Sequence, residues 1–305
     1  MRVVFLGSKP LGFNALTRLH RIAPDSISGI ITIDDRSDIR SALGDFEAFA
    51  RAQEVPFHVA RVRKDAAQTL LAWKPDCCFV LGWYWLLERD VLQAVPRGFL
   101  GVHNSLLPRY RGFSPLVWSM INGEEEVGYS VFSMTEAMDE GPVWVQRALK
   151  VGPEEHVGEV LHRLEADLME TLEDLYPKIL EGSARPQPQP GDVPPTYCAQ
   201  RVESDGQIDW RWPAVQVFNF IRAQSDPYPG AFTFDGGEKV RMLRARLHGP
   251  TYYGRPGQVA RVEPSGVQVI CGDNKAVVLE EVERGGKRGA AAQFLRSISI
   301  RLGHP

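Results

Sequence analysis

Short apolar runs alternate with amphipathic segments along the first part of the chain. The apolar runs have the length of buried strands and lie at residues 3–6, 28–33, 55–59 and 77–81. Apolar positions at helical spacing mark the segments between them, at residues 14–22, 45–53 and 66–73. This alternation predicts an α/β domain with a mostly parallel sheet.

Further helices and strands are predicted in the rest of the chain. Helices are predicted at residues 88–94, 114–121, 154–180, 214–223 and 291–297. Strands are predicted at residues 128–134 and 143–151, and then at 232–234, 239–245, 257–262, 266–270 and 276–283, with a turn at 285–289. The late strands are short and separated by polar turns, which predicts a small β-barrel. Five prolines within residues 182–195 predict an extended linker, so we expect two domains, residues 1–190 and 200–305.

Polar residues follow the buried run at residues 77–81, in the segment 101–112. At the carboxyl edge of a parallel sheet, such residues lie where open α/β folds place their chemistry. His103 exchanges protons near neutral pH, and the later Asp139 could hold its tautomer, so the two could form a general acid/base unit. From these residues alone, a hydrogen-bonded structural histidine and a simple turn aspartate explain the pattern equally well.

Composition and charge narrow the function classes. The 305 residues are 44% hydrophobic and 24% charged, with a net charge of −3, so we expect a globular protein without the basic surface that nucleic acid requires. No apolar run approaches ~18 residues, and no signal segment is evident, so we expect a cytoplasmic protein that does not enter membranes. The four cysteines have no metal-ligand spacing, and the glycines at residues 7–12 lack a dinucleotide fingerprint, so we expect neither a metal nor NAD.

A longer motif carries a family resemblance. It comprises His-x-Ser-Leu-Leu-Pro-x-Tyr-Arg-Gly at residues 103–112, Pro115, Ile121-Asn122-Gly123, Gly128 and Met138-Asp139-x-Gly141. This order resembles the 10-formyltetrahydrofolate-dependent formyltransferase family, which includes methionyl-tRNA, sugar-nucleotide and hydroxyornithine formyltransferases. The resemblance implies a Rossmann-like catalytic domain followed by an OB-like barrel, with His103 and Asp139 as the catalytic residues. The later Ile-Asp-Trp and Pro-Tyr-Pro-Gly-Ala segments resemble the carboxyl-terminal domain of tRNA and aminoarabinose formyltransferases.

One position departs from the family. Two residues before the histidine the family has an asparagine, whereas this chain has Gly101. In the family that amide stabilises the oxyanion, and losing one such donor typically costs about 10²–10³ in rate. Asn104 and Ser105 are supporting candidates, although residues 103 and 104 of an extended chain point to opposite sides. A backbone N–H or water, a residue from elsewhere, or a different reaction are the open explanations.

The resemblance also implies binding residues. Trp83, Trp85, Leu86 and Met138 become candidate contacts for the 10-formyltetrahydrofolate co-substrate, although aromatic residues at a loop more often pack at a core edge. Arg109, Tyr110 and Arg111 become substrate-adjacent, with an anion clasp or a solvated surface as alternatives.

The resemblance leaves the acceptor to be inferred. The tRNA-specific members carry a basic insertion in the early part of the first domain, whereas residues 34–40 here are short and mixed in charge. We therefore expect transfer to a small amine, an amino sugar nucleotide or a hydroxyornithine-like amino acid, and we include a homodimer among the expected partners. A formyltransferase fold with altered chemistry and a folate-binding protein without turnover are the alternatives.

Overall fold

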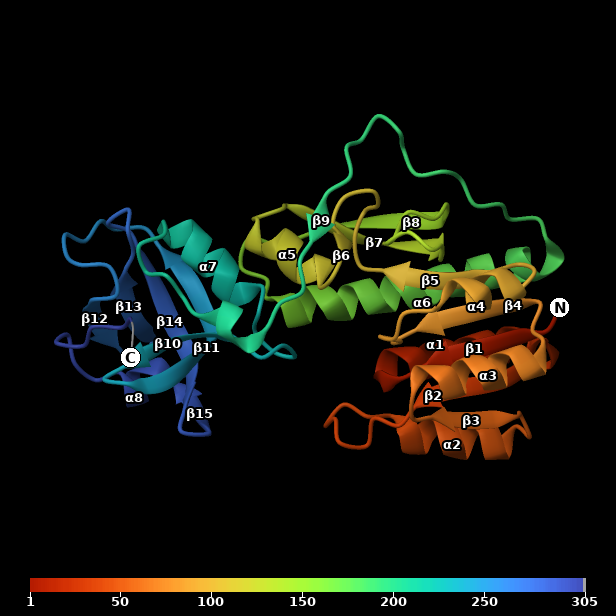
Figure 1. Cartoon of the computed structure of the whole chain (residues 1–305). Helices are drawn as coiled ribbons and strands as arrows, with labels where there is room; N and C mark the ends of the chain where they lie inside the picture. The colour runs from red at the N-terminus through yellow and green to blue at the C-terminus, as the bar shows by residue number, and fades with distance from the viewer. Residues whose placement is uncertain (304–305) are drawn as a thin grey trace. The chain divides into compact units, whose positions relative to one another are not determined.

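The computed structural model describes residues 1–303. The chain divides into two compact units, which are described separately (Figure 1). The first unit comprises Met1–Arg111, Gly128–Ala148 and Arg163–Tyr197. The second comprises Gly112–Val127, Leu149–His162 and the described residues from Cys198 onward.

A seven-stranded sheet forms the centre of the first unit, in the order β3-β2-β1-β4-β5-β7-β8. Its strands are β1 Val3–Gly7, β2 Ile27–Ile33, β3 Phe57–Ala60, β4 Cys77–Leu81, β5 Phe99–His103, β7 Glu126–Ser133 and β8 Val143–Lys150. Neighbouring strands from β3 to β5 pair in parallel, and β7 pairs antiparallel with β5. The predicted mostly parallel α/β sheet is thereby confirmed.

Amphipathic helices bury their apolar sides against this sheet. They are α1 Lys9–Ile22, α2 Leu43–Ala52, α3 Arg63–Trp73, α4 Arg89–Ala94 and, from residue 163 onward, α6 Val157–Glu181; a short 3-10 turn, η1, spans Pro24–Ser26. On α6, the buried ring of Tyr176 meets Phe79 of β4 edge-on with centroids 5.2 Å apart. The Tyr176 hydroxyl shares a 2.6 Å hydrogen bond with Ser26 Oγ, so the phenol is satisfied inside the core.

In the first unit, the clearest differences from the sequence-based expectation concern β5 and the start of α1. No strand was predicted at residues 99–103, whereas Gly101 and His103 both lie in β5. The strand was missed because its apolar run is broken by Gly101 and ends in a histidine, whereas pairing with β4 and β7 fixes its conformation. Helix α1 begins at Lys9 rather than near Asn14, because Pro10 in the first turn needs no hydrogen bond for its nitrogen.

The second unit is built on an antiparallel sheet of the short late strands, and their closure into a barrel stays a prediction. The sheet runs β10 Ala231–Asp235, β11 Glu238–His248, β14 Ala276–Arg284, β13 Gly266–Ile270 and β12 Val259–Glu263, with β15 Lys287–Ala290 also paired to β14. Residues 287–289, expected in a turn, lie in β15, because Gly285 and Gly286 make the whole turn with φ of 56° and 74°. The terminal segment bridges both sheet edges, from Arg301 to Gln258 and from Gly303 to Phe234.

Helices complete the second unit. They are α5 Pro115–Ile121, α7 Ala214–Arg222 and α8 Ala291–Phe294, with a 3-10 turn, η2, at Glu203–Gly206. The apolar side of α7, including Phe218 and Ile221, packs into the core formed with the sheet. Helix α8 ends at Phe294 rather than at residue 297. Two further short strands, β6 Arg111–Gly112 and β9 Tyr197–Cys198, pair with each other.

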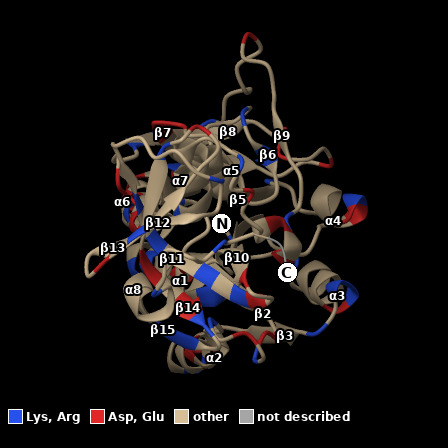
Figure 2. Ribbon diagram, turned by 90° about the vertical axis from the view of Figure 1, so that its left-hand side faces the viewer, with Lys and Arg blue, Asp and Glu red and all other residues tan. Residues whose placement is uncertain are grey.

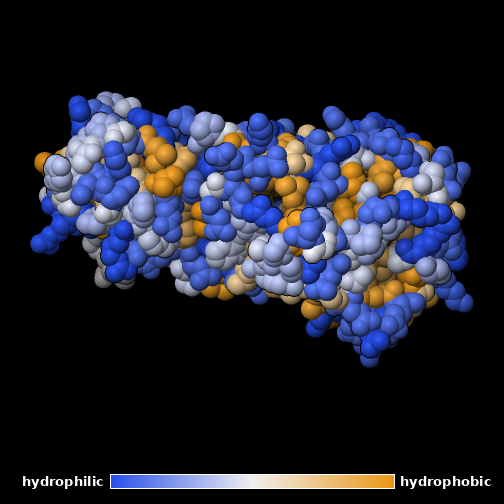
Figure 3. Space-filling model, turned by 90° about the horizontal axis from the view of Figure 1, so that it is seen from above, coloured by the Kyte–Doolittle hydropathy of each residue, from blue (hydrophilic) through white to orange (hydrophobic). Residues whose placement is uncertain are grey.

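The face shown in Figure 3 is mainly hydrophilic, and its apolar side chains form several separate patches. Within residues 1–303, no helix has the length and apolar character needed to cross a bilayer.

A buried histidine in the second unit makes stability depend on pH. His156 is 5% exposed, its Nδ1 donates to the Glu154 carbonyl at 3.1 Å, and its Nε2 accepts from the Ala245 N–H at 3.3 Å. Burial lowers the pKa of His156, so below about pH 6.5 the unfolded chain binds a proton that the folded chain excludes. Stability therefore falls as the pH falls through this window.

We expect the urea midpoint to fall between about pH 7.5 and about pH 5.5, and to fall less in His156→Gln. Glutamine keeps a donor and an acceptor but does not titrate. The matched control is His162→Gln, at an exposed position of α6, which should show the full wild-type fall. An equal fall in His156→Gln and wild type would contradict this assignment.

Candidate active site

The polar motif lies at the carboxyl edge of the parallel sheet. Strands β4 and β5 run parallel with Val80 opposite Gly101, so the residues that follow β4 and the end of β5 at His103 share one edge. Strands β1 and β4 are neighbours in the sheet. The strand that follows β1 in the chain, β2, lies on one side of this pair, and the strand that follows β4, β5, lies on the other side. Open α/β sheets bind ligands at such a switch point.

His103 closes β5 and is held in one orientation. Its side chain is buried, with 8% of its surface exposed, and its ring lies edge-on to Phe132. Nε2 donates to the carbonyl oxygen of Tyr110 at 2.7 Å. Because Nε2 carries the proton in this arrangement, Nδ1 has the free lone pair, and Nδ1 lies 3.6 Å from Asp139 Oδ2. The fold thus brings together the histidine and the aspartate that the sequence singled out.

Asp139 sits in a tight turn after β7. Its backbone is left-handed, with φ of 52°. A Cβ at Gly141 would lie 1.7 Å from the Ser133 carbonyl oxygen, so only glycine fits where the turn returns to the strand. The side-chain amide of Gln189 donates to the Asp139 carbonyl at 2.6 Å and to the Gly141 carbonyl at 2.9 Å. Sequence reasoning missed Gln189, which lies in the segment predicted only as a linker.

Polar residues on β7 and β8 hold the loop after His103. Ser130 Oγ donates to the Ser105 carbonyl at 2.7 Å, and Gln146 Nε2 donates to the Leu107 carbonyl at 3.0 Å. Ser105 Oγ donates to the Arg109 carbonyl at 2.7 Å, so this hydroxyl serves the loop itself. Asn104 is half-buried beside it. Ser130 is wholly buried, and its position between Tyr129 and Val131 in β7 is the sequence signal that could have pointed to this network.

An apolar side chain occupies the space beside Gly101. A Cβ built there would lie 3.2 Å from both Cγ and Sδ of Met134 and 3.4 Å from Phe132 Cε1. Met134 packs against the apolar core on this side of the sheet. In this chain, therefore, the position of the family's asparagine side chain is bordered by a thioether, a weak hydrogen-bond acceptor that cannot donate.

Arg111 is neither a solvated arginine nor an open anion clasp. It is 8% exposed; Nη1 donates to Glu140 Oε1 at 2.9 Å and Nη2 donates to Gln189 Oε1 at 2.7 Å. Its guanidinium also lies over the ring of Tyr197, 5.9 Å from the centroid. Arg109 is exposed, with its guanidinium 5.5 Å from the Tyr110 ring centroid. Arg111 therefore serves the structure of the loops around Asp139.

An apolar pocket opens beside the segment that follows β4. It is narrow and is lined by Leu6, Arg63, Ala66, Ala67, Leu70, Trp83, Trp85, Leu86, Leu87, Glu88 and Val91. Trp83 and Trp85 meet edge-on at 5.5 Å, and Leu86 is 75% exposed at the rim. Among the described residues, the buried Nε1 of Trp83 has no hydrogen-bond partner, which leaves a donor for a ligand. Met138 is half exposed in the Asp139 turn and is not among the lining residues.

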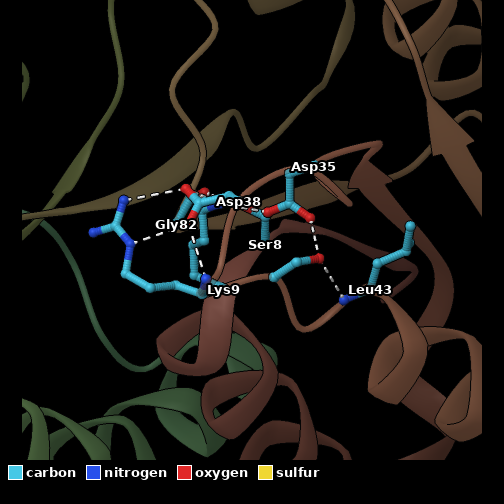
Figure 4. A network of polar contacts seen from close by, with 8 residues as sticks. Ser8, Lys9, Asp35, Asp38, Leu43 and Gly82 are labelled. Atoms are coloured by element: carbon cyan, nitrogen blue, oxygen red, sulfur yellow. Dashed lines mark hydrogen bonds and ion pairs between the residues drawn. The ribbon is translucent and has the colours of Figure 1, made fainter. Parts of the chain in front are cut away.

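A charge cluster at the ends of β1 and β2 was not predicted (Figure 4). Lys9 Nζ lies 2.6 Å from Asp35 Oδ2 and 2.8 Å from Asp38 Oδ2, and Ser41 Oγ donates to Asp35 Oδ1 at 2.5 Å. Burial opposes the charge on Lys9, but the hydrogen bonds to both carboxylates outweigh it and raise the pKa of Lys9.

Next to this cluster, the chain after β1 meets the chain after β4. Ser8 Oγ donates to the carbonyl of Gly82. Only glycine fits at position 82, where φ is 69° and a Cβ would lie 2.2 Å from the Ser8 carbonyl oxygen.

The thiols contribute no reactive group. All four cysteines are buried and none forms a disulfide, and burial raises the pKa of Cys77 and of Cys271 to about 12. Within residues 1–303, no three histidine, cysteine, aspartate or glutamate side chains cluster to hold a metal ion.

Comparison with known proteins agrees with this geometry. The family described as "Formyl transferase" matches residues 1–174, and "Formyl transferase, C-terminal domain" matches residues 202–299. The methionyl-tRNA formyltransferase of Myxococcus xanthus is 30% identical over 308 residues, which covers 99% of this chain and 96% of that protein.

Solved structures share the fold at low identity. HypX from Aquifex aeolicus, in complex with tetrahydrofolic acid, has a TM-score of 0.64 and 20% identity; the match covers 98% of this chain and 47% of HypX. The N-formyltransferase from Helicobacter canadensis, in complex with folinic acid and dTDP-3-aminofucose, has a TM-score of 0.68 and 13% identity, with 92% and 98% covered. From the family matches and the full-length relative, the chain belongs to the formyl transferase family, the 10-formyltetrahydrofolate-dependent family that its motif resembles.

Proposed function

We propose that this enzyme transfers a formyl group from 10-formyltetrahydrofolate to a small primary amine or hydroxylamine, with amino sugar nucleotides and hydroxyornithine-like amino acids as the leading acceptors. The observation that carries the proposal is the His103 and Asp139 pair: Nε2 is committed to Tyr110, and Nδ1 faces the carboxylate at 3.6 Å. A histidine whose other nitrogen is fixed can accept a proton at one defined atom.

In the proposed reaction, His103 and Asp139 handle the proton transfers. As the amine nitrogen bonds to the formyl carbon, Nδ1 of His103 takes a proton from that nitrogen. The carboxylate of Asp139 stabilises the imidazolium that forms. The proton then passes to N10 of the folate as the bond between N10 and the formyl carbon breaks, which regenerates neutral His103. Because position 101 carries no side chain, the donor to the developing oxyanion has to be a backbone N–H group, water or another residue.

The pocket beside Trp83 is suited to the flat, polar-edged pterin of the folate. Its lining is apolar and aromatic, and a ring that enters it could accept a hydrogen bond from the Nε1–H of Trp83, which is buried without a partner among the described residues. The solved structures of HypX and of the Helicobacter canadensis N-formyltransferase hold tetrahydrofolic and folinic acid, respectively. This supports a folate pocket formed by Trp83, Trp85 and Leu86.

The charges favour a small acceptor. Both arginines of the segment after β2 are paired with carboxylates, Arg36 with Asp34 at 3.3 Å and Arg40 with Asp38 at 3.2 Å. In the view of Figure 2, acidic and basic residues are interspersed. A tRNA acceptor requires many lysine or arginine contacts to phosphate, and cations already paired with carboxylates contribute little to such contacts.

Methionyl-tRNA is the second candidate acceptor. The reason is the 30% identity, over nearly the full length of both chains, to the methionyl-tRNA formyltransferase of Myxococcus xanthus. Enzymes with altered chemistry and folate-binding proteins without turnover are less well supported, because His103 and Asp139 face each other at the sheet edge.

An acceptor panel tests the proposal. We expect purified enzyme with 10-formyltetrahydrofolate to release tetrahydrofolate only when an amine is added, with turnover on an amino sugar nucleotide or hydroxyornithine and none on methionyl-tRNA. His103→Ala should abolish the acceptor-dependent release. Turnover on methionyl-tRNA alone would replace the small-amine acceptor with tRNA. Folate binding without release for every acceptor would contradict formyl transfer.

A further inference from the structure

The proline-rich segment 186–197, here called the strap, is fixed along the first unit rather than free. Figure 1 shows it as the extended trace between α6 and β9. At its start, Gln187 and Val143 exchange backbone hydrogen bonds of 2.7 and 2.8 Å. At its end, the Thr196 N–H donates to the Pro108 carbonyl at 3.3 Å, and the Thr196 carbonyl accepts from the Arg111 N–H at 2.8 Å. Prolines keep the strap extended, so little conformational entropy is lost when it docks.

Between these two attachments, Gln189 contacts the Asp139 turn with its amide nitrogen and Arg111 with its amide oxygen. Nε2 donates to the carbonyls of Asp139 and Gly141, at 2.6 and 2.9 Å. Oε1 accepts from Arg111 Nη2 at 2.7 Å. Asp139 has a positive φ, an unfavourable backbone for a non-glycine residue that persists only where surrounding contacts enforce it. The Gln189 amide is one of these contacts, and it acts on the peptide groups directly beside the carboxylate.

Thr196 acts on His103 indirectly, through the backbone of Tyr110. Its Oγ1 accepts from the Tyr110 N–H at 2.8 Å. The carbonyl of Tyr110 in turn accepts from His103 Nε2 at 2.7 Å, and Tyr110 also has a positive φ, of 59°. One segment therefore fixes the backbone next to Asp139 and the backbone that orients His103.

We propose that Gln189 and Thr196 are positioning residues that set the geometry between His103 Nδ1 and Asp139, an inference that rests on the proposed function of this pair. Proton transfer depends steeply on alignment, and a displacement of about 1 Å can lower a rate by about 10²-fold. The strap is thus part of the catalytic apparatus, although it contributes no group to the reacting atoms.

The kinetic test compares three substitutions on the strap. Gln189→Leu removes the whole amide; Gln189→Glu keeps an oxygen for Arg111 but loses the two donors and opposes the carbonyls with a carboxylate. Both should lower kcat by about 10- to 100-fold and leave the KM for 10-formyltetrahydrofolate within about twofold. Gln187→Leu is the matched control, since that side chain is exposed on the same strap, and it should leave both constants unchanged.

Thr196→Val tests the second contact of the strap independently. Valine keeps the shape but loses the Oγ1 acceptor, so kcat should fall while the KM for 10-formyltetrahydrofolate does not. Wild-type kcat in both Gln189→Leu and Thr196→Val, in an enzyme that His103→Ala inactivates, would overturn the positioning role and leave the proposed function intact. Full activity in Gln189→Glu alone would also overturn it, because the bond to Arg111 would then be the contact that matters.

Hydrogen exchange tests the strap without reference to turnover. Amides of residues 135–141 should exchange faster in Gln189→Leu and Gln189→Glu than in wild type, and at the wild-type rate in Gln187→Leu. Unchanged exchange in both Gln189 variants would overturn the inference even in an active enzyme. If no acceptor supports turnover in wild type, the proposed function fails, and the exchange result alone then decides whether the strap orders the turn.

Discussion

Replacing His103 by alanine is expected to lower kcat for formyl transfer by about 10²–10⁴-fold, the range of a positioned general base. The ring is nearly buried, and Nε2 is held by Tyr110, so only Nδ1 can accept the proton of the attacking amine. Tetrahydrofolate release under saturating acceptor measures this loss. Folate binding by the same variant should persist, because His103 does not line the pocket beside Trp83.

Asp139→Asn separates the charge of the carboxylate from its shape. Asparagine keeps the size of the side chain but cannot stabilise an imidazolium 3.6 Å away, so kcat should fall while folate binding is retained. His162→Ala, at an exposed position of α6, is the matched histidine control and should keep wild-type kcat. Full activity in His103→Ala would show that the pair does not handle the proton and would overturn the mechanism.

Introducing the family's amide requires two substitutions. A Cβ at residue 101 would lie 3.2 Å from Met134 Cγ and Sδ, so Gly101→Asn alone should crowd the thioether and gain little. In the Met134→Ala background the space is free, and the added Asn amide can donate to the developing oxyanion. We expect the double variant to exceed Met134→Ala by about 10²–10³-fold in kcat, equivalent to about 2.7–4 kcal/mol.

The four kinetic constants form a double-mutant cycle. Wild type, the two single variants and the double variant report how far residues 101 and 134 depend on each other. A positive coupling is expected, because each residue is suited to the present form of the other. A double variant slower than Met134→Ala would contradict this prediction. Gly101 would then belong to a reaction different from the formyl transfer that the rest of the family performs.

Local sequence determined the kinds of most elements and the identity of the pair that we propose to react. Apolar runs predicted β1, β2 and β4, and helical spacing predicted α2 and α3, since periodicity of 2 or 3.6 residues is a property of neighbours along the chain. The motif around His103 and Asp139 also resides in short segments, so a family resemblance was visible before any contact was known.

Tertiary structure decided what those residues touch. β5 is a strand because β4 and β7 pair with it, although its own pattern is weak. The strap that holds the Asp139 turn is a proline-rich linker by composition, and only the docking of Gln189 gives it a second role. The contact between Met134 and the space beside Gly101, and the ion pair between Lys9 and Asp35, likewise join residues far apart in sequence. Such contacts depend on which strands become neighbours, and one-dimensional patterns do not encode that choice.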